Sequence, residues 1–248
     1  MKTSGNTILI TGGTSGIGRG FAEEFSRRDN TVITCGRREE QLLELTEFFP
    51  DIITTMCDVN VVEEREALFQ WVVENYPDVN ILINNAGIQL PFDMTKEVDI
   101  TRLNTEIGIN LVAPIHLSSL FAQHFKEKDE AAIINISSGL AFVPIAVVPV
   151  YCATKAAIHS ISMSLRYQLK ETSVKVFEII PPSVDSELGV ERRENKNATH
   201  GGMPVIAFIN EALEAIENDE LEAAVSHAKN LREKGETLFD SMNEHVRR

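Results

Sequence analysis

Tyr151 and Lys155 lie four residues apart in the segment YCATK, a spacing that places both side chains on one face of a helix. Free tyrosine has a pKa of about 10, which is too high for efficient general-base catalysis at neutral pH. A neighbouring ammonium favours the phenolate and lowers that pKa. The pair therefore predicts a phenol tuned for proton transfer, and the alternative is two solvated side chains without a joint role. The elements that carry the pair decide between the two.

Short runs of β-branched residues alternate with helix-like segments along most of the chain. The runs are rich in Val and Ile without polar alternation, which is typical of strands buried on both faces of a parallel sheet. This alternation predicts an α/β protein with a Rossmann-type, doubly wound parallel sheet in three layers, α/β/α. We expect strands at 7–11, 31–35, 51–57, 80–85, 131–137 and 174–180. We expect helices near 17–28, 39–48, 61–76, 101–127 and 151–171.

The chain changes character after Pro181-Pro182. Residues 185–203 are polar and contain glycine, so we predict a mobile loop there that closes over the substrate. Helices are expected at 204–217 and 229–246, with a weak strand near 221–226. Because we find no internal repeat, low-complexity linker or second domain boundary, residues 1–248 are predicted to form one domain.

The composition of the 248 residues is globular, with 43% hydrophobic and 24% charged residues, and the chain can bury a full core. The net charge of −14 opposes binding to nucleic acids and anionic membranes, so neither partner is expected. Cys35, Cys57 and Cys152 form no CxxC motif, and their low, odd number suits a reducing compartment. Because no apolar run has the length of a signal peptide or a membrane span, we predict a cytoplasmic protein.

The first expected strand leads directly into TGGTSGIG, a glycine-rich strand-to-helix turn. Glycine permits positive φ and lets a phosphate approach the backbone, while the helix N-terminus offers unpaired N–H groups to a pyrophosphate. The strand, turn and opening helix are the setting that this motif requires, so we predict a dinucleotide site rather than an ordinary turn. The residues expected to form it are Thr11, Gly12, Thr14, Ser15, Gly16, Ile17 and Gly18.

Four motifs occur in the order and at the separations of one known family: TGGTSGIG at 11–18, NNAG at 84–87, NISS at 135–138 and YCATK at 151–155. Together they make the chain resemble the short-chain dehydrogenase/reductase family over about its first 190 residues. The segment PPSVDSEL at 181–188 is similar to one in a bacterial branch that includes the DltE-type oxidoreductases. The resemblance implies an oxidoreductase that transfers hydride between a nicotinamide cofactor and a carbonyl or alcohol substrate.

The resemblance also implies which groups are catalytic beside Tyr151 and Lys155. The family's serine lies thirteen residues before the tyrosine and hydrogen-bonds the substrate oxygen, and this separation selects Ser138. Ser137 is the competitor, but adjacent strand residues face opposite sides, so one of the two faces the cleft. By the same resemblance, Lys155 also binds the ribose that carries the nicotinamide.

Asn110 lies inside the expected helix 101–127, in the segment GINLVAP. Pro114 is four residues further on and has no N–H, so the carbonyl of Asn110 is free to hold a water. In the family this asparagine orients a water that leads to the lysine, which implies that Asn110 belongs to a proton relay. The alternative is a simple helix kink at the proline.

The end of the second expected strand, TCGRREE, bears on the choice of dinucleotide. NAD-binding members usually carry an acid there that accepts from the ribose 2′-hydroxyl, and Gly36 stands in its place. Arg37 and Arg38 follow, and a guanidinium can hold a 2′-phosphate through a charge-assisted fork. We therefore expect NADP(H) rather than NAD(H). The alternative is that the two arginines only pair with Glu39 or Glu40.

Further cofactor contacts are implied by the resemblance. Asp58 resembles the adenine contact of the family and Val59 could pack on the ring, although Asp58 could equally cap the expected helix 61–76. The remaining implied positions are Asn84, Ala86 and Gly87 under the adenosine half, and Pro181, Val184 and Ser186 near the nicotinamide. Pro182 replaces the glycine that is usual in the family and fixes φ there. No metal site is expected.

Two apolar stretches, 88–92 and 140–150, are expected along the cleft. They favour a hydrophobic carbonyl or alcohol, unless they are plain core or subunit packing. The expected helices 101–127 and 151–171 carry broad apolar faces, which in this family often pair between subunits, so we predict a homodimer or homotetramer.

Two other functions stay open. A nucleotide-binding sensor or scaffold would bind NADP(H) without turnover, but it would not need Ser138, Tyr151 and Lys155 together. An epimerase or dehydratase of the extended branch also uses a Tyr-x₃-Lys pair. Such chains usually add a larger C-terminal substrate domain, for which this chain has little room.

Overall fold

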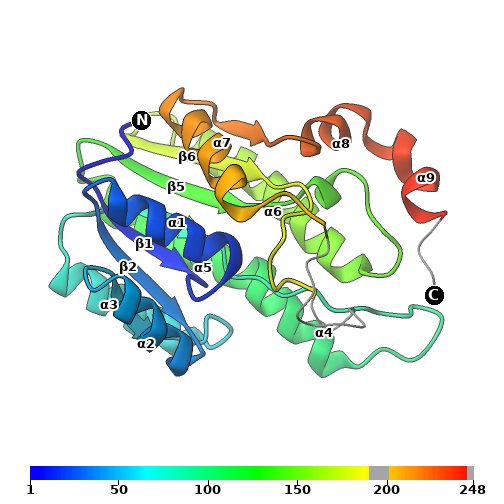
Figure 1. The fold of residues 1–248 in the computed structure, drawn as a ribbon, viewed down its shortest axis with the longest axis horizontal. Coiled ribbons are helices and arrows are strands. Elements are labelled where there is room, and N and C mark those ends of the chain that lie inside the picture. Colours follow the sequence, from blue (N-terminus) through cyan, green and yellow to red (C-terminus); the bar gives the residue numbers. More distant parts are fainter. Residues whose placement is uncertain (190–200, 245–248) are drawn as a thin grey trace.

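The computed structural model of the protein describes residues 1–189 and 201–244. A seven-stranded parallel sheet with the strand order β3-β2-β1-β4-β5-β6-β7 forms its centre (Figure 1). The order runs outward in both directions from β1 and β4, as expected for a doubly wound sheet, so the predicted fold class is confirmed. The strands are β1 (Thr7–Thr11), β2 (Thr31–Gly36), β3 (Ile53–Met56), β4 (Val79–Asn84), β5 (Ala131–Ile136), β6 (Val174–Ile180) and β7 (Glu222–Ala224).

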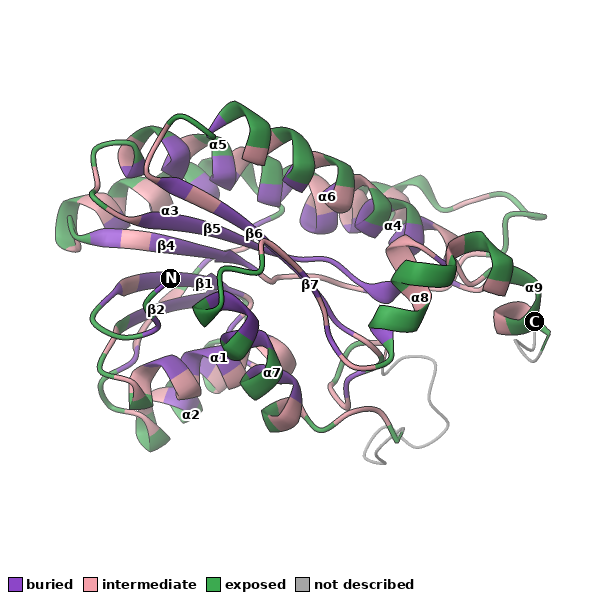
Figure 2. Ribbon diagram, turned by 90° about the horizontal axis from the view of Figure 1, so that it is seen from above, coloured by how far each residue is buried: buried purple, intermediate pink, exposed green. Residues whose placement is uncertain are grey.

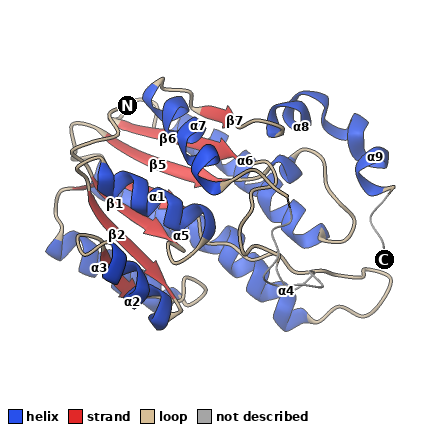
Figure 3. Ribbon diagram, viewed as in Figure 1, coloured by secondary structure: helices blue, strands red, loops and turns tan. Residues whose placement is uncertain are grey.

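Helices cover both faces of the sheet (Figure 2). One layer contains α1 (Gly16–Arg27), α2 (Glu39–Phe48) and α7 (Val205–Glu217). The other contains α3 (Val62–Asn75), α4 (Ile100–Ile107), α5 (Ala113–Phe125) and α6 (Pro149–Gln168). Two short helices, α8 (Ala228–Lys234) and α9 (Phe239–Asn243), lie beyond the carboxyl ends of the strands (Figure 3). Among the described residues, no helix combines the length and hydrophobicity that crossing a bilayer requires.

The core has two halves because strand side chains alternate between the faces of the sheet. On one face, Phe21 and Phe25 of α1 and Phe208 of α7 pack beneath the sheet in one cluster. On the other, Phe121 and Phe125 of α5 pack in a second cluster. All six residues of β5 are buried, which agrees with its uninterrupted apolar run AAIINI.

The helix expected at 101–127 is divided by a wider turn. α4 ends at Ile107, residues Gly108–Val112 form a π-helical turn, and α5 begins at Ala113. A Cβ at Gly108 would overlap the amide end of the Asn60 side chain, so a larger residue there would require that side chain to move. Pro114 near the start of α5 lacks the N–H that a regular α-helix would bond to Asn110, which explains why the wide turn is tolerated here.

The prediction of one helix at 229–246 is wrong for its described part. α8 ends at Lys234, a 3-10 turn covers Gly235–Leu238, and α9 follows. Gly235 has φ of 53°, a left-handed conformation that breaks the helix. The expected weak strand near 221–226 is present as the edge strand β7, paired with β6. The loop predicted at 185–203 falls partly on residues 190–200, which lie outside the described residues.

Candidate active site

The glycine turn connects β1 to α1 and has the backbone geometry that its sequence predicts. Gly12 and Gly16 have φ of 69° and 55°, where residues with a side chain are strained. A Cβ at Gly12 would lie 2.8 Å from Cα of Ala86, and one at Gly18 would overlap Asn85 and the Gly12 carbonyl. The turn therefore packs directly on the segment that follows β4, and larger residues are excluded at these positions.

Thr11, the last residue of β1, holds the glycine turn against the segment after β4 through hydrogen bonds. Its hydroxyl donates to the Ile83 carbonyl at 3.3 Å and accepts from the backbone N–H groups of Asn85 and Ala86, each at 3.1 Å. Asn85 in turn donates to the carbonyl of Thr11 at 2.9 Å and of Gly12 at 3.1 Å. Thr11 thus joins two strand ends, and its hydroxyl already has three partners within the chain.

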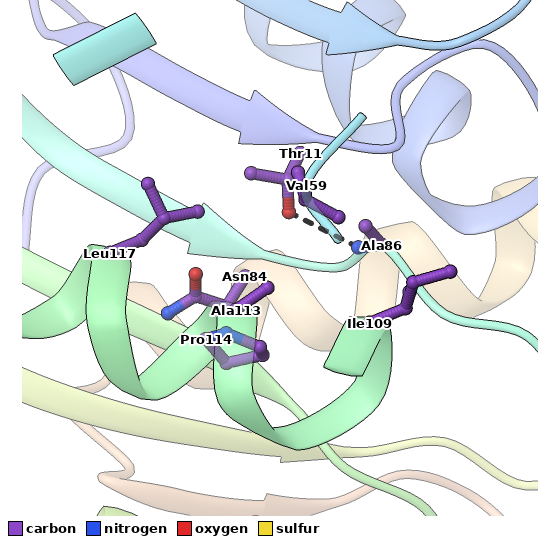
Figure 4. Close-up of a pocket in the computed structure, with 8 residues that line it drawn as sticks. All are labelled: Thr11, Val59, Asn84, Ala86, Ile109, Ala113, Pro114 and Leu117. Atoms are coloured by element: carbon purple, nitrogen blue, oxygen red, sulfur yellow. Dashed lines mark hydrogen bonds between the residues drawn. The ribbon is translucent and has the colours of Figure 1, made fainter. Parts of the chain in front are cut away.

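A small hollow lies behind this joint (Figure 4). It is lined by Thr11, Val59, Asn84, Ala86, Ile109, Ala113, Pro114 and Leu117. It has no room for a water molecule, so it cannot hold a dinucleotide. We interpret it as packing space between the strand ends and α5.

Arg38 reaches across the mouth of the glycine turn. One of its terminal nitrogens donates to Ser15 Oγ at 2.9 Å and to Thr14 Oγ1 at 3.2 Å, and the other pairs with Glu187 at 2.8 Å. The Arg38 side chain is half exposed. Gly36 leaves room for Thr14, because a Cβ there would lie 2.7 Å from Thr14 Cγ2. A guanidinium, two hydroxyls and the helix N-terminus are donors of the kind that hold phosphate.

Arg37 faces Asp58 instead, with 3.8 Å between the nearest nitrogen and oxygen. Asp58 accepts from the backbone of Asn60 at 2.9 Å, while the N-cap of α3 is Val61. The alternative role of Asp58 as the cap of that helix is therefore wrong. Among the described residues, neither arginine forms an ion pair with Glu39 or Glu40, so that alternative is not supported either.

α6 carries the Tyr151 and Lys155 pair into the core. Pro149 opens this helix at its first turn, where a missing N–H costs nothing, and small residues follow. Tyr151 and Lys155 are both almost fully buried. Lys155 Nζ donates to the carbonyl of Ile136 at 2.8 Å and lies 5.6 Å from the centre of the Tyr151 ring. The two groups are therefore neighbours in a dry environment, and they are not solvated side chains.

Burial changes the charge of this lysine. Desolvation lowers the pKa of Lys155 from its ordinary 10.5 to about 8, and the negative charge of Glu178 partly opposes the decrease. Lys155 is therefore an ammonium at neutral pH, but one that loses its proton more easily than a surface lysine.

Asn110 lies in the π turn and faces the same region. Its side chain accepts from the N–H of Ile88 at 2.9 Å and donates to the Ile88 carbonyl at 2.8 Å. It also donates to Thr154 Oγ1 of α6 at 3.3 Å. A Cβ at Gly87 would lie 3.4 Å from Asn110 Oδ1 and 3.8 Å from Lys155 Nζ. Both side chains therefore approach the backbone at Gly87.

Ser138 follows the end of β5 and caps a 3-10 turn, where its Oγ accepts from the N–H of Leu140 at 3.1 Å. Ser137 is 1% exposed, and its Oγ has no partner among the described residues. Because Ser138 Oγ is the acceptor in this contact, its hydroxyl proton stays available to another acceptor. Ser137 points into the protein, in agreement with the opposite orientation of adjacent residues.

The segment after β6 returns to the glycine turn. Pro181 accepts a hydrogen bond from Gly139 at 2.9 Å, and Val184 is buried and forms a bridge with Met203. A Cβ at Gly16 would lie 3.0 Å from Cβ of Ser186. The predicted site residues that follow β1, β5 and β6 therefore lie together at the carboxyl ends of these strands.

A family model described as short chain dehydrogenase matches residues 6–197, which is most of the chain. The chain belongs to the short-chain dehydrogenase/reductase family. It is 42% identical to an uncharacterised oxidoreductase, DltE of Bacillus subtilis, over 98% of both chains. It is 32% identical to a benzil reductase that forms (S)-benzoin, from Bacillus cereus, over 75% of this chain and 79% of that one.

Solved structures of the family share its architecture. A short-chain dehydrogenase of Sphingobium yanoikuyae in complex with NADPH has a TM-score of 0.82 and 25% identity, with 92% of both chains covered. A short-chain dehydrogenase/reductase of Burkholderia phymatum in complex with NAD has a TM-score of 0.85 at 20% identity, with 94% of this chain and 93% of that one covered. The second likeness shows the fold alone.

This short-chain dehydrogenase/reductase also has a polar row across its sheet that the sequence analysis missed. Asn84, Asn135, Glu178 and Glu222 occupy paired positions on four neighbouring strands, β4 to β7. Asn84 donates to Asn135 at 2.8 Å and to Ser118 of α5 at 2.9 Å. Because paired residues of parallel strands point to the same face, the row lies beneath α5 and α6. Asn84 thus links two strands to α5 through its amide N–H groups, and its expected place under the adenosine half stays a prediction.

Two further side chains of this enzyme form hydrogen bonds to loops next to the site. Glu106 of α4 is fully buried and accepts from the backbone N–H of Leu90 at 3.1 Å. Burial raises the pKa of Glu106 to about 7. Asn243 of α9 accepts from Ala146 N at 2.6 Å and donates to the Pro144 carbonyl at 3.1 Å. Glu106 is an acid in the expected helix 101–127, but its burial is visible only in the structure. The contact of Asn243 with Ala146 spans 97 residues and had no local signal either.

Proposed function

We propose that this enzyme is an NADP(H)-dependent oxidoreductase that interconverts a carbonyl compound and its alcohol. Ser138, Tyr151, Lys155 and Asn110 form its catalytic set in this proposal. The observation that carries it is the buried Lys155 ammonium, one helical turn from Tyr151 and in hydrogen-bond contact with the end of β5. A scaffold that only senses a nucleotide has no use for a desolvated ammonium beside a phenol.

The residues fit a dinucleotide. The turn from β1 to α1 keeps its glycines at positions where a Cβ would clash, and its helix N-terminus suits a pyrophosphate. When bound, a nicotinamide supplies or accepts the hydride. Family membership supports this cofactor class, as do related structures solved in complex with NADPH, NADP or NAD.

In carbonyl reduction, Tyr151 donates a hydrogen bond to the substrate oxygen and delivers its proton there. Ser138 donates a second hydrogen bond to the same oxygen and stabilises the charge that develops on it. Lys155 stabilises the resulting phenolate with its positive charge. Asn110 fixes the backbone at Ile88 and holds a water that returns a proton through Lys155. In alcohol oxidation the same groups act in reverse.

We propose NADP(H) rather than NAD(H) because of Arg38. Its guanidinium lies against Ser15 and Thr14, and Gly36 replaces the acid that would repel a 2′-phosphate. Hydrogen bonds to charged groups contribute about 1.5–3 kcal/mol, so the change R38Q should reduce kcat/KM for NADPH by about 10–100-fold and change that for NADH little. R37Q is the matched control. Equal kcat/KM values for NADPH and NADH in the wild type would overturn the preference.

The substrate class we propose is a hydrophobic, bulky ketone or aldehyde, or the matching alcohol. Tyr151 and Cys152 pack with Leu140, Ile145 and Val147 in one apolar cluster beside the catalytic tyrosine. The relative named benzil reductase, which acts on a diaryl diketone by its name, supports this class. Absorbance at the NADPH band with aromatic, aliphatic and sugar-like carbonyls would test it. Absence of hydride transfer to every carbonyl, despite cofactor binding, would favour the sensor instead.

We also propose that the enzyme is a homodimer or homotetramer and that one domain carries the whole site. Large apolar side chains are exposed on α5, on α6 and at the end of the π turn, namely Val112, Ile115, Met163 and Tyr167. A self-complementary contact between two copies would cover them. Light scattering is expected to give at least twice the chain mass of 27.6 kDa. A monomer in solution would contradict this proposal.

A further inference from the structure

Glu178 is an acid in an otherwise apolar strand. It lies in β6, in the segment VKVFEII, and it is 0% exposed. One carboxylate oxygen, Oε2, lies 2.8 Å from Nδ1 of His159 on α6. The other, Oε1, is buried and has no hydrogen-bond partner among the described residues. A buried carboxylate with one unsatisfied oxygen is costly, so its presence calls for a compensating charge.

Lys155 is a buried cation on the same helix as His159. Lys155 and His159 are one helical turn apart, so they project from the same side of the helix. The Lys155 ammonium bonds the neutral carbonyl of Ile136, and no carboxylate of the described residues lies within 4.0 Å of it. Ile136 directly follows Asn135, which is the β5 partner of Glu178. Lys155 and Glu178 therefore occupy neighbouring positions under one helix. Lys155 has no carboxylate in contact, and Glu178 has His159 at one oxygen and no partner among the described residues at the other.

The other charged groups around the pair have partners elsewhere. Glu222 of β7 lies 4.0 Å from His159 and binds Arg232 of α8 at 2.7 Å. Arg232 also lies over the Phe142 ring, which packs edge-on against His159. A guanidinium therefore already supplies the positive charge at this end of the row, which argues against a metal ion there.

The remaining charged groups near α6 are also engaged with other partners, so they do not pair with Lys155 or Glu178. Arg166 of α6 bonds the carbonyls of Val176 and Leu221. Glu106 comes from α4, which packs on α6, and its carboxylate is engaged with Leu90. Glu178 is thus the acid placed to balance the Lys155 ammonium from the sheet side.

We propose that Glu178 is a positioning residue for the reaction, whose buried negative charge keeps Lys155 protonated, and that His159 holds its carboxylate in place. The inference rests on the proposed function, because it gives a role to the charge of the proposed catalytic lysine. The direction is consistent with the electrostatics of the site. Burial lowers the pKa of Lys155 to about 8, while Glu178 acts to raise it, so removing this carboxylate lowers the pKa further.

The test is the change E178Q, which keeps the shape of the side chain and removes its charge. An opposite charge nearby typically shifts a pKa by about 1–3 units, so we expect the titration of Lys155 to move down by about 1 pH unit. The titration is followed by NMR of lysines labelled at Cε, with Lys155 assigned by its loss in K155M. E222Q is the matched control, because it removes a charge from the same row one strand farther away.

The kinetic readout is the pH profile of kcat for carbonyl reduction. In E178Q, the rate should fall on the alkaline side from a lower pH than in the wild type. E178D, which restores the charge, should return the profile toward that of the wild type. If E178Q does not fold, H159Q carries the test, with a smaller downward shift expected because the carboxylate then loses its support.

An unchanged Lys155 titration in folded E178Q, or an equal shift in E222Q, would overturn the inference. The NMR measurement needs no turnover, so it separates this inference from the proposed function. A wild-type enzyme that transfers no hydride would reject the proposed function, and the Lys155 titration would still decide whether Glu178 sets its charge.

Discussion

The two ends of the candidate site are built by different physical means. At the glycine turn the shape depends on missing side chains, because a Cβ at Gly12 or Gly18 would run into the segment after β4. Under α6 the site depends on charges that are present but desolvated, with Lys155 and Glu178 both buried. Substitutions at the first end should therefore act through steric fit and cofactor binding. Substitutions at the second should act on rate and its dependence on pH.

The largest effect is expected at the α6 end, for Y151F. Removing the phenol hydroxyl removes the proposed proton donor, and general acid–base groups contribute about 10²–10⁴-fold to rate. Turnover should fall by that factor in a steady-state assay, while NADPH binding measured by fluorescence stays largely intact. Y167F is the matched control, because Tyr167 lies on the same helix and is exposed. A fully active Y151F enzyme would refute the mechanism.

At the glycine end, G12A should weaken cofactor binding and lower the free energy of unfolding by about 1–3 kcal/mol. Two causes act together, the φ of 69° and the contact of the new Cβ with Ala86. G5A separates them, because Gly5 has φ of 73° with no atom within 4 Å of a new Cβ. Urea unfolding and NADPH titration measure both effects. Equal losses in the two variants would mean that close packing at Gly12 contributes nothing.

A pH test concerns Glu106, whose pKa is raised by burial from 4.5 to about 7. Between pH 4.5 and pH 7, Glu106 is protonated in the folded state and ionised in the unfolded state. The stability that this group contributes is therefore lost as the pH rises from 4.5 through 7. E106Q removes this dependence. The wild type should therefore lose about 2 kcal/mol relative to E106Q between pH 5 and pH 8, measured by urea unfolding. E66Q, on the exposed surface of α3, should show no such difference.

The smallest effect is expected for N243A, outside both ends. Asn243 holds the loop at 144–146, which precedes Tyr151, through two hydrogen bonds. Each is worth about 0.5–1.5 kcal/mol, so loss of loop order should raise KM for a bulky ketone by roughly 3–10-fold. NADPH binding should not change. S241A, in the same short helix, is the control, and an equal rise of KM in S241A would contradict the assignment.

The sequence predicted the local features of this enzyme well because their causes are local. Apolar β-branched runs form the strands, and the glycine turn has the positive φ values that its composition favours. The four motifs identified the family, which the match over residues 6–197 confirmed. The residue roles, the NADP(H) preference, the oligomer and the cytoplasmic location stay predictions.

What the sequence missed depends on contacts between distant segments or on backbone conformation. The interaction of His159 with Glu178 joins a helix to a strand, and the lone acid within VKVFEII was its one local signal. The break in the helix at 229–246 arises from the left-handed Gly235, which the apolar pattern does not reveal. Asp58 was ambiguous because an acid between a strand and a helix can contact a cofactor or cap the helix, and spacing alone does not distinguish these.

The π turn at Gly108–Val112 means that the number of residues between α4 and α5 matters as much as their identity. It accommodates an extra residue between α4 and α5. Deleting any one residue there would restore regular winding, and each residue of an α-helix rotates the chain by about 100°. Either Glu106 would then turn away from Leu90, or Phe121 and Phe125 would turn out of the core. A one-residue deletion in this segment is therefore expected to be far more damaging than most substitutions in it.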